Sequence, residues 1–174
     1  MEKKLTTPIT TDVIKTLNIG DEVLISGYIY TARDAAHKLL VEAIKNKQEL
    51  PFDLKDQVIY YVGPTPAKPG EIIGSCGPTS SYRMDKFSPY LMDKGLKVMI
   101  GKGDRSKAFN AEVANYQGLY LIAIGGIGAK LSQTVVENQI VAYEELQSEA
   151  IRRLKVVDFP AIVAIDYQGN SIFK

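Results

Sequence analysis

Short apolar runs and amphipathic stretches alternate along this chain, and the alternation predicts strands separated by helices. Residues 22–30 predict a strand that ends at Thr31, and apolar residues at three- and four-residue spacing predict a helix over 33–47. Before them we expect a short strand and a helix of about two turns that begins near residues 10–11. Arg33 therefore stands where a strand passes into a helix.

The rest of the chain continues the same alternation. Two continuous apolar runs bounded by glycine, 97–101 and 119–124, predict strands buried on both faces. The other expected elements, in chain order, are a strand at 58–63, a short strand at 71–76, helices at about 80–94 and 106–116, a short helix after the segment GGIGAK, and several β-branched runs near the end. This order indicates a mixed α/β domain and excludes a helical bundle or a solenoid.

The composition indicates a globular protein and argues against binding to nucleic acid or membranes, but it does not identify a binding partner. The chain has 174 residues, 45% hydrophobic and 24% charged, which suits one globular domain over residues 1–174. Its formal net charge of +1 provides no electrostatic basis for wrapping a nucleic-acid backbone. The longest apolar run, Leu119 to Ile124, is too short to span a membrane, and no apolar secretion segment follows the charged N-terminus. We therefore expect a cytoplasmic protein that binds neither nucleic acid nor membrane.

Cys76 is the only cysteine. A single cysteine excludes a disulfide within the chain and is too few for an iron–sulfur or other multi-cysteine site, so we expect no metal bound by this chain alone. Cys76 adjoins a hydroxyl-rich segment, which leaves nucleophilic chemistry open, but the sequence places no base beside it. A small buried residue is the simpler interpretation.

The segment GSCGPTSSYRMD, residues 74–85, joins a predicted strand to a predicted helix. Amides at a helix N-terminus, hydroxyl side chains and an arginine one turn later are groups that bind anions, and Arg83 can contact a carboxylate through two nitrogens. Thr79 and Arg83 are four residues apart, so they share one helix face if the helix begins early enough to include Thr79. The alternative is an ordinary capping hydroxyl at Ser80 or Ser81 followed by a solvated arginine.

Two further strand ends carry positive charge. The word TARDAAHK places Arg33, Asp34 and the only histidine, His37, in the first turn of a predicted helix. The word GKG places Lys102 between two glycines directly after a predicted buried strand. The alternatives to a binding role are that His37 is a packed residue of the core and that Lys102 is an exposed charge in a turn. If these strand ends share one edge of a sheet, the three cations and Thr79 converge and suit a small dianion.

Three longer sequence motifs carry a resemblance to a known family. They are Arg33-Asp34-Ala35-Ala36-His37, Gly77-Pro78-Thr79 followed by Arg83-Met84-Asp85, and Gly101-Lys102-Gly103 followed by Arg105-Ser106. Through these motifs, and over nearly its whole length, the sequence resembles the C-terminal domain of class I fumarate hydratases and the β subunit of two-chain L-tartrate dehydratases. The resemblance implies the swivelling β/β/α fold of that family, an α/β domain with a mixed sheet core and outer helices.

The resemblance also implies a hydro-lyase that acts on a small dicarboxylate, here as the β subunit of an enzyme that interconverts fumarate and L-malate. In that family three cysteines of the α part hold a four-iron four-sulfur cluster. The cluster is then expected on a separate α subunit, in an assembly of two α and two β chains. An L-tartrate dehydratase β subunit, which yields oxaloacetate, and a non-catalytic dicarboxylate-binding module are the alternatives.

Residue roles follow from the family's motifs position by position. The family's substrate-contacting arginine, threonine, arginine and lysine fall on Arg33, Thr79, Arg83 and Lys102. Thr79 inherits the role of catalytic base, and Arg83 supplies the neighbouring charge that a weakly basic hydroxyl needs. Supporting roles behind them are expected for Asp34, His37 and Asp85. The sequence differs from the residues common in the family at Ser80, Ser81, Tyr82 and Asp104. These differences leave the identity of the substrate open.

Overall fold

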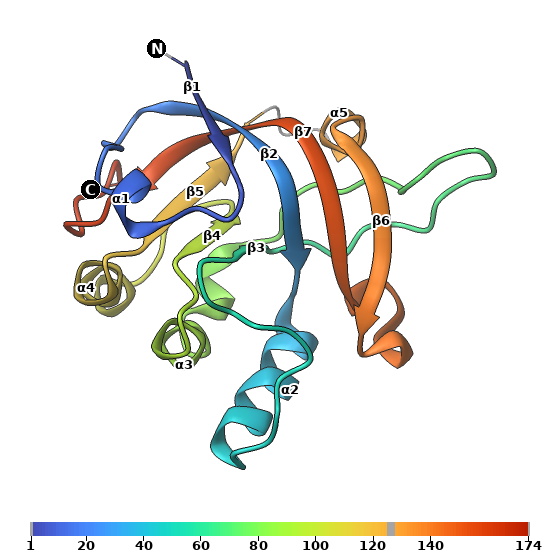
Figure 1. Ribbon diagram of the computed structural model, residues 1–174, viewed down its shortest axis with the longest axis horizontal. Helices are drawn as coiled ribbons and strands as arrows, with labels where there is room; N and C mark the ends of the chain where they lie inside the picture. The colour runs from blue at the N-terminus through green and yellow to red at the C-terminus, as the bar shows by residue number, and fades with distance from the viewer. Residues whose placement is uncertain (1, 125–127, 174) are drawn as a thin grey trace.

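The computed structural model describes residues 2–124 and 128–173, and Figure 1 shows how its elements are arranged. Its strands are β1 (Glu2–Thr6), β2 (Glu22–Thr31), β3 (Val58–Tyr60), β4 (Val98–Gly101), β5 (Leu119–Ala123), β6 (Val135–Ala142) and β7 (Ile151–Ile165). Its helices are α1 (Thr11–Ile14), α2 (Asp34–Lys45), α3 (Ser88–Asp93), α4 (Lys107–Tyr116), α5 (Gly128–Ser132) and the 3₁₀ turns η1 (Ser81–Met84) and η2 (Glu144–Glu149). Within the two described ranges no helix is long and apolar enough to cross a membrane.

A seven-stranded sheet takes its strands from both ends of the chain, in the order β1-β2-β3-β4-β5-β7-β6. Strands β2, β3, β4 and β5 run parallel, as expected where helices connect successive strands. The long strand β7 pairs antiparallel with β2 and, near its C-terminal end, with β5, so these five strands close on themselves (Figure 1). Closure removes the free edges that β2 and β5 would otherwise present.

Alternation along the strands divides the core into two clusters. In β3, Val58 and Tyr60 belong to the cluster inside the closed sheet, whereas Ile59 and the following Tyr61 belong to the cluster beneath the helices. The outer cluster also takes the apolar sides of α2, α3 and α4, which lie on one side of the sheet in Figure 1. The expected α/β class, with a mixed sheet core and outer helices, is confirmed.

The strand predicted at residues 71–76 is wrong. The chain leaves the sheet after β3 and forms a long arm, drawn in green in Figure 1. The arm closes at its base, where the amide of Thr65 donates to the carbonyl oxygen of Ser75 at 3.0 Å. Prolines at 64, 66 and 69 lack the N–H that a strand ladder needs, so the residues after β3 cannot continue as a regular strand into 71–76.

The helix predicted over 80–94 is broken into η1 and α3. Pro89 has no N–H to continue a helix through the residues before it, but it is tolerated in the first turn of α3. Ser88 Oγ donates to the Met84 carbonyl oxygen at 2.9 Å and covers one end of η1. The first predicted helix is also shorter than expected, because α1 has a single turn.

Helix α2 begins directly after Arg33 and buries His37 in its first turn. The imidazole has no exposed surface and lies near Tyr61 and Phe87, with ring centroids 5.4 and 6.0 Å away. Nδ1 lies 2.8 Å from the carbonyl oxygen of Arg33, and since a carbonyl can only accept, Nδ1 carries the proton. Burial lowers the pKa of His37 from 6.5 to about 4.

The buried histidine makes the stability of the fold sensitive to acid. Between pH 6.5 and about 4 the unfolded chain protonates His37 while the folded chain keeps it neutral, so the free energy of unfolding falls as the pH drops through this window. The loss from this group between pH 6.5 and pH 5 is about 2 kcal/mol. In His37→Gln, whose amide can still donate to Arg33, urea unfolding at the two pH values should show a smaller loss. Equal pH dependence in both proteins would contradict this prediction.

Candidate active site

The carboxyl ends of three parallel strands meet at one edge of the sheet. Thr31 at the end of β2 pairs with Tyr60 of β3, and Tyr60 pairs with Ile100 of β4. Arg33 and Lys102 each stand two residues beyond one of these positions. Both cations therefore lie at the edge where open α/β sheets usually bind their ligands.

A short segment before η1 extends the sheet at this edge. The amide of Thr79 donates to the carbonyl oxygen of Tyr61 at 2.8 Å. The amide of Ser81 donates to the carbonyl oxygen of Lys102 at 3.1 Å, and Ser80 forms a bridge with the same lysine. These amides are occupied, so the anion site expected from free helix amides is wrong for Thr79 and Ser81.

Arg83 links the threonine hydroxyl to a carboxylate. Its Nη2 donates to Thr79 Oγ1 at 2.9 Å and to Asp34 Oδ1 at 3.2 Å, and its Nε lies 3.1 Å from Asp34 Oδ2. Asp34 also faces Arg33, whose Nε lies 3.8 Å from Oδ1. The three charged side chains are between 29% and 39% exposed, so a ligand can reach them. The start of α2 and the segment around η1, which are distant in the sequence, thus share one cluster of hydroxyl, carboxylate and guanidinium groups.

The Arg33 side chain rests against the chain that follows β3. A Cβ on Gly63 would come within 2.9 Å of Arg33 Cδ and 3.2 Å of the Ser148 carbonyl oxygen. A larger residue at this position would therefore displace the arginine or the backbone near it. From the other side, His37 binds the Arg33 carbonyl oxygen, so the arginine is supported by a buried group on its own helix.

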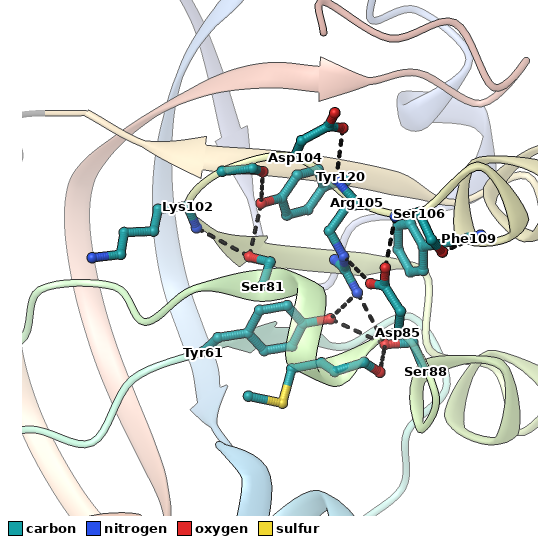
Figure 2. Close-up of polar contacts among 12 residues, drawn as sticks. Tyr61, Ser81, Asp85, Ser88, Lys102, Asp104, Arg105, Ser106, Phe109 and Tyr120 are labelled. Carbon is teal, nitrogen blue, oxygen red and sulfur yellow. Dashed lines mark hydrogen bonds and ion pairs between the residues drawn. The ribbon is translucent and has the colours of Figure 1, made fainter. Parts of the chain in front are cut away.

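Lys102 and Asp85 stand apart from the cluster around Arg83. Lys102 approaches the cluster through its main chain, and its exposed side chain extends away from the buried residues in Figure 2. Asp85 turns towards Arg105 and forms an ion pair with its Nε, while its Oδ2 accepts from the amide of Ser106 at 2.7 Å. Asp85 therefore supports the loop after β4 and does not face Thr79.

Arg105 is a buried residue to which the sequence motifs assigned no role. Its side chain has no exposed surface, and its guanidinium carbon lies 3.5, 4.7 and 5.2 Å from the ring centroids of Phe109, Tyr120 and Tyr61 (Figure 2). Its Nη2 donates to the hydroxyls of Tyr61 and Ser88, both at 3.2 Å. In the sequence, only the position of Arg105 just after the GKG motif pointed to it. Its partners Tyr61 and Tyr120 lie within apolar runs that predict strands, so nothing in the sequence links them to Arg105.

The described part of the chain does not suit an iron–sulfur cluster. It contains no group of three or more His, Cys, Asp or Glu side chains that could hold a metal ion. Cys76 is buried, its Sγ lies 3.9 Å from the Gly128 carbonyl oxygen, and burial raises the pKa of its thiol to about 11. Because the thiolate is the form that binds iron or attacks a substrate, the interpretation of Cys76 as a small buried residue fits the structure.

Known proteins resemble this chain over most of its length. A model of the family described as Fumarase C-terminus matches residues 2–174. The anaerobic class I fumarate hydratase of Escherichia coli (strain K12) is 39% identical over 158 residues, which cover 90% of this chain and 29% of that protein. The putative L(+)-tartrate dehydratase subunit beta of Methanocaldococcus jannaschii is 38% identical over 167 residues, which cover 92% of this chain and 86% of that protein. The putative class I fumarate hydratase of Geobacillus stearothermophilus is 35% identical over 173 residues, which cover 97% of this chain and 33% of that protein.

These relatives differ in how much of their own length this chain spans. It spans about a third or less of the fumarate hydratases and most of the tartrate dehydratase subunit. The family match, over residues 2–174, includes Arg33, Thr79, Arg83 and Lys102. The chain belongs to the Fumarase C-terminus family.

Proposed function

We propose that this chain is the β subunit of a two-chain hydro-lyase that reversibly hydrates fumarate to L-malate. Membership of the family, and a match that covers 86% of a relative named as a beta subunit, support this class of enzyme. The observation that carries the proposal is the hydrogen bond from Arg83 to Thr79 beside Arg33. This bond holds a hydroxyl against one guanidinium, while a second guanidinium faces the same Asp34. Removal of a proton next to a carboxylate requires such a base beside positive charge.

Binding of the dianionic substrate is assigned to three cations. Arg33 and Arg83 present planar guanidinium groups that match the geometry of a carboxylate, and Lys102 adds a compact charge from the neighbouring loop. Asp34 contacts two nitrogens of Arg83 and so keeps its plane oriented. The negative charge that develops on the carboxylate next to the deprotonated carbon is stabilised by the same cations.

Proton transfer is assigned to Thr79. A neutral hydroxyl is a weak base, but Arg83 Nη2 donates to Thr79 Oγ1, and a positive charge at that distance favours the deprotonated form of the hydroxyl. In the dehydration direction Thr79 takes the proton from the carbon beside the carboxylate. In the hydration direction the same oxygen returns it, so one residue serves both directions.

We propose a second chain because the described residues offer no set of ligands for an iron–sulfur cluster. The four-iron four-sulfur cluster of the family is assigned to an α subunit with three ligating cysteines, because no set of ligands for it is found within 2–124 and 128–173. Held there, the cluster supplies a Lewis acid for the hydroxyl group that leaves. The relative named as a beta subunit supports a partner chain, and we propose two α and two β chains in the assembly.

Dehydration of L-tartrate to oxaloacetate is the second candidate function. The relative from Methanocaldococcus jannaschii favours it, because its name gives that activity and this chain covers 86% of its length. Tartrate and malate differ by one hydroxyl, so the same cations suit both. A non-catalytic dicarboxylate-binding module is the third candidate, and it predicts a chain that purifies without a cysteine-rich partner.

Activity assays on the complex separate these functions. The chain purified anaerobically together with its α subunit should form fumarate from L-malate, followed by the ultraviolet absorbance of the conjugated double bond. Oxaloacetate formation from L-tartrate should be weak by comparison. Strong tartrate activity without malate activity would establish the second candidate. Dicarboxylate binding with neither activity, and with no partner recovered, would establish the third.

Substitutions of Thr79 test the proposed base. Thr79→Val keeps the shape of the side chain without the hydroxyl and should lower kcat by on the order of a hundredfold or more. Its KM should change little, because the three cations remain. Thr79→Ser keeps the hydroxyl and should retain part of the activity. Full activity in Thr79→Val, in a complex that still assembles, would overturn the assignment.

Substitution of Arg83 tests the paired contact with Thr79 and Asp34. Arg83→Lys keeps the charge but cannot contact both partners through a planar group, so kcat/KM should fall on the order of a hundredfold. Arg153→Lys is the matched control, since Arg153 binds Gln139 on the outward face of β7. Wild-type activity in Arg83→Lys would show that charge alone suffices and would contradict the proposed geometry.

A further inference from the structure

Lys102 is held through its main chain by a residue outside the proposed catalytic set. Ser81 donates its amide to the Lys102 carbonyl oxygen at 3.1 Å, and the Lys102 amide donates to Ser81 Oγ at 3.0 Å. One serine thus satisfies the amide and the carbonyl of the lysine. Because the ammonium is exposed at the end of a flexible side chain, its reach depends on where this main chain stands.

Tyr120 completes the arrangement from β5. Its hydroxyl oxygen lies 2.7 Å from Ser81 Oγ, a contact drawn in Figure 2. The same oxygen lies 2.7 Å from the carbonyl oxygen of Gly103. A carbonyl can only accept, so Tyr120 donates its proton to Gly103 and accepts from Ser81. The bonds then run in one direction, from the Lys102 amide through two hydroxyls to Gly103, and bonds in such a chain strengthen one another. We call Ser81, Lys102, Gly103 and Tyr120 the Lys102 clamp.

The hydroxyl groups of the Lys102 clamp are shielded from water. Ser81 and Tyr120 have no exposed surface, and burial raises the pKa of Tyr120, so the phenol keeps the proton that it donates. The guanidinium carbon of Arg105 lies 4.7 Å from the centroid of the Tyr120 ring and restrains it. A hydrogen bond without competing water is stronger than the same bond at the surface.

Gly101 leaves the space that the Lys102 clamp needs. A Cβ at this position would overlap Ser81 Oγ and would come within 2.8 Å of Tyr61 Cδ2. The second glycine of the GKG word, Gly103, has a φ of +81°, a conformation that other residues rarely adopt. Both glycines therefore serve the placement of the lysine between them, for two different physical reasons.

We propose that Tyr120 and Ser81 are positioning residues that hold the main chain of Lys102 so that its ammonium meets one carboxylate of the substrate. The proposal rests on the proposed function, in which Lys102 contacts a dicarboxylate. Neither hydroxyl touches the substrate. A displacement of a binding group by about 1 Å can change a rate by about a hundredfold, so a loosened clamp has a measurable effect.

Tyr120→Phe tests the proposal because it removes one hydroxyl and keeps the ring. In the complex with the α subunit it should lower kcat/KM about tenfold, mainly through KM. Tyr116→Phe makes the same change on α4, where the hydroxyl reaches Asp93 at 3.4 Å, and should have no effect. In a Lys102→Ala background, Tyr120→Phe should lower kcat/KM by less than about twofold further. A full tenfold loss in that background, or no loss in either background, would overturn the proposal.

Amide hydrogen exchange separates this proposal from the proposed function. In peptides of the complex that contain Lys102, Tyr120→Phe should quicken exchange roughly fivefold and Tyr116→Phe should leave it unchanged. Unchanged exchange in Tyr120→Phe contradicts the Lys102 clamp independently of any activity. Faster exchange in a complex without activity on malate or tartrate supports the clamp and rejects the proposed function.

Discussion

Two main-chain hydrogen bonds at strand ends determine the geometry of the candidate site. They join Thr79 to Tyr61 and Ser81 to Lys102, and they turn the segment before η1 into a short continuation of the sheet. From this position Arg83 reaches back to the Thr79 hydroxyl. A continuous helix through the same residues would also bring Arg83 near Thr79, but it would leave both unconnected to the loop after β4. The sheet, rather than a helix end, therefore organises the site.

The buried ion pair of Arg105 and Asp85 supports this pairing from the helix side of the sheet. It connects the loop after β4 to the turn after η1, and three aromatic rings replace water around the guanidinium. Burial of two charges has a desolvation cost, which their attraction offsets only when the geometry is good. We therefore infer that the main role of the ion pair is to position the two loops, and that it adds little net stability. Removal of either partner would leave a buried charge, which typically destabilises a protein by about 3–5 kcal/mol.

The charge of the site is local. The whole chain carries a formal net charge of +1, yet Arg33 and Arg83 both face Asp34 at one edge of the sheet, and Lys102 stands on the neighbouring loop. A protein of this net charge exerts little long-range attraction on an anion. If the substrate is the dianion that we propose, its selection comes from short-range contacts, and the orientation of Arg83 and the placement of Lys102 then matter more than the number of cations.

Much of the fold was predictable, because alternation and amphipathic spacing are local properties of a chain. They predicted β2, β4, β5, α2 and α4 near their observed bounds, and the strand ends located Arg33 and Lys102. They failed at residues 71–76, which lie in the arm after β3, and at 80–94, where Pro89 prevents one continuous helix. The hydroxyl-rich segment of residues 74–85 singled out Thr79 and Arg83, and the resemblance to a known family assigned their roles. Only the tertiary structure decided that Asp34 lies against Arg83 and that Tyr120 braces the loop of Lys102, because these contacts join residues 49 and 17 positions apart and no spacing rule within one element encodes them.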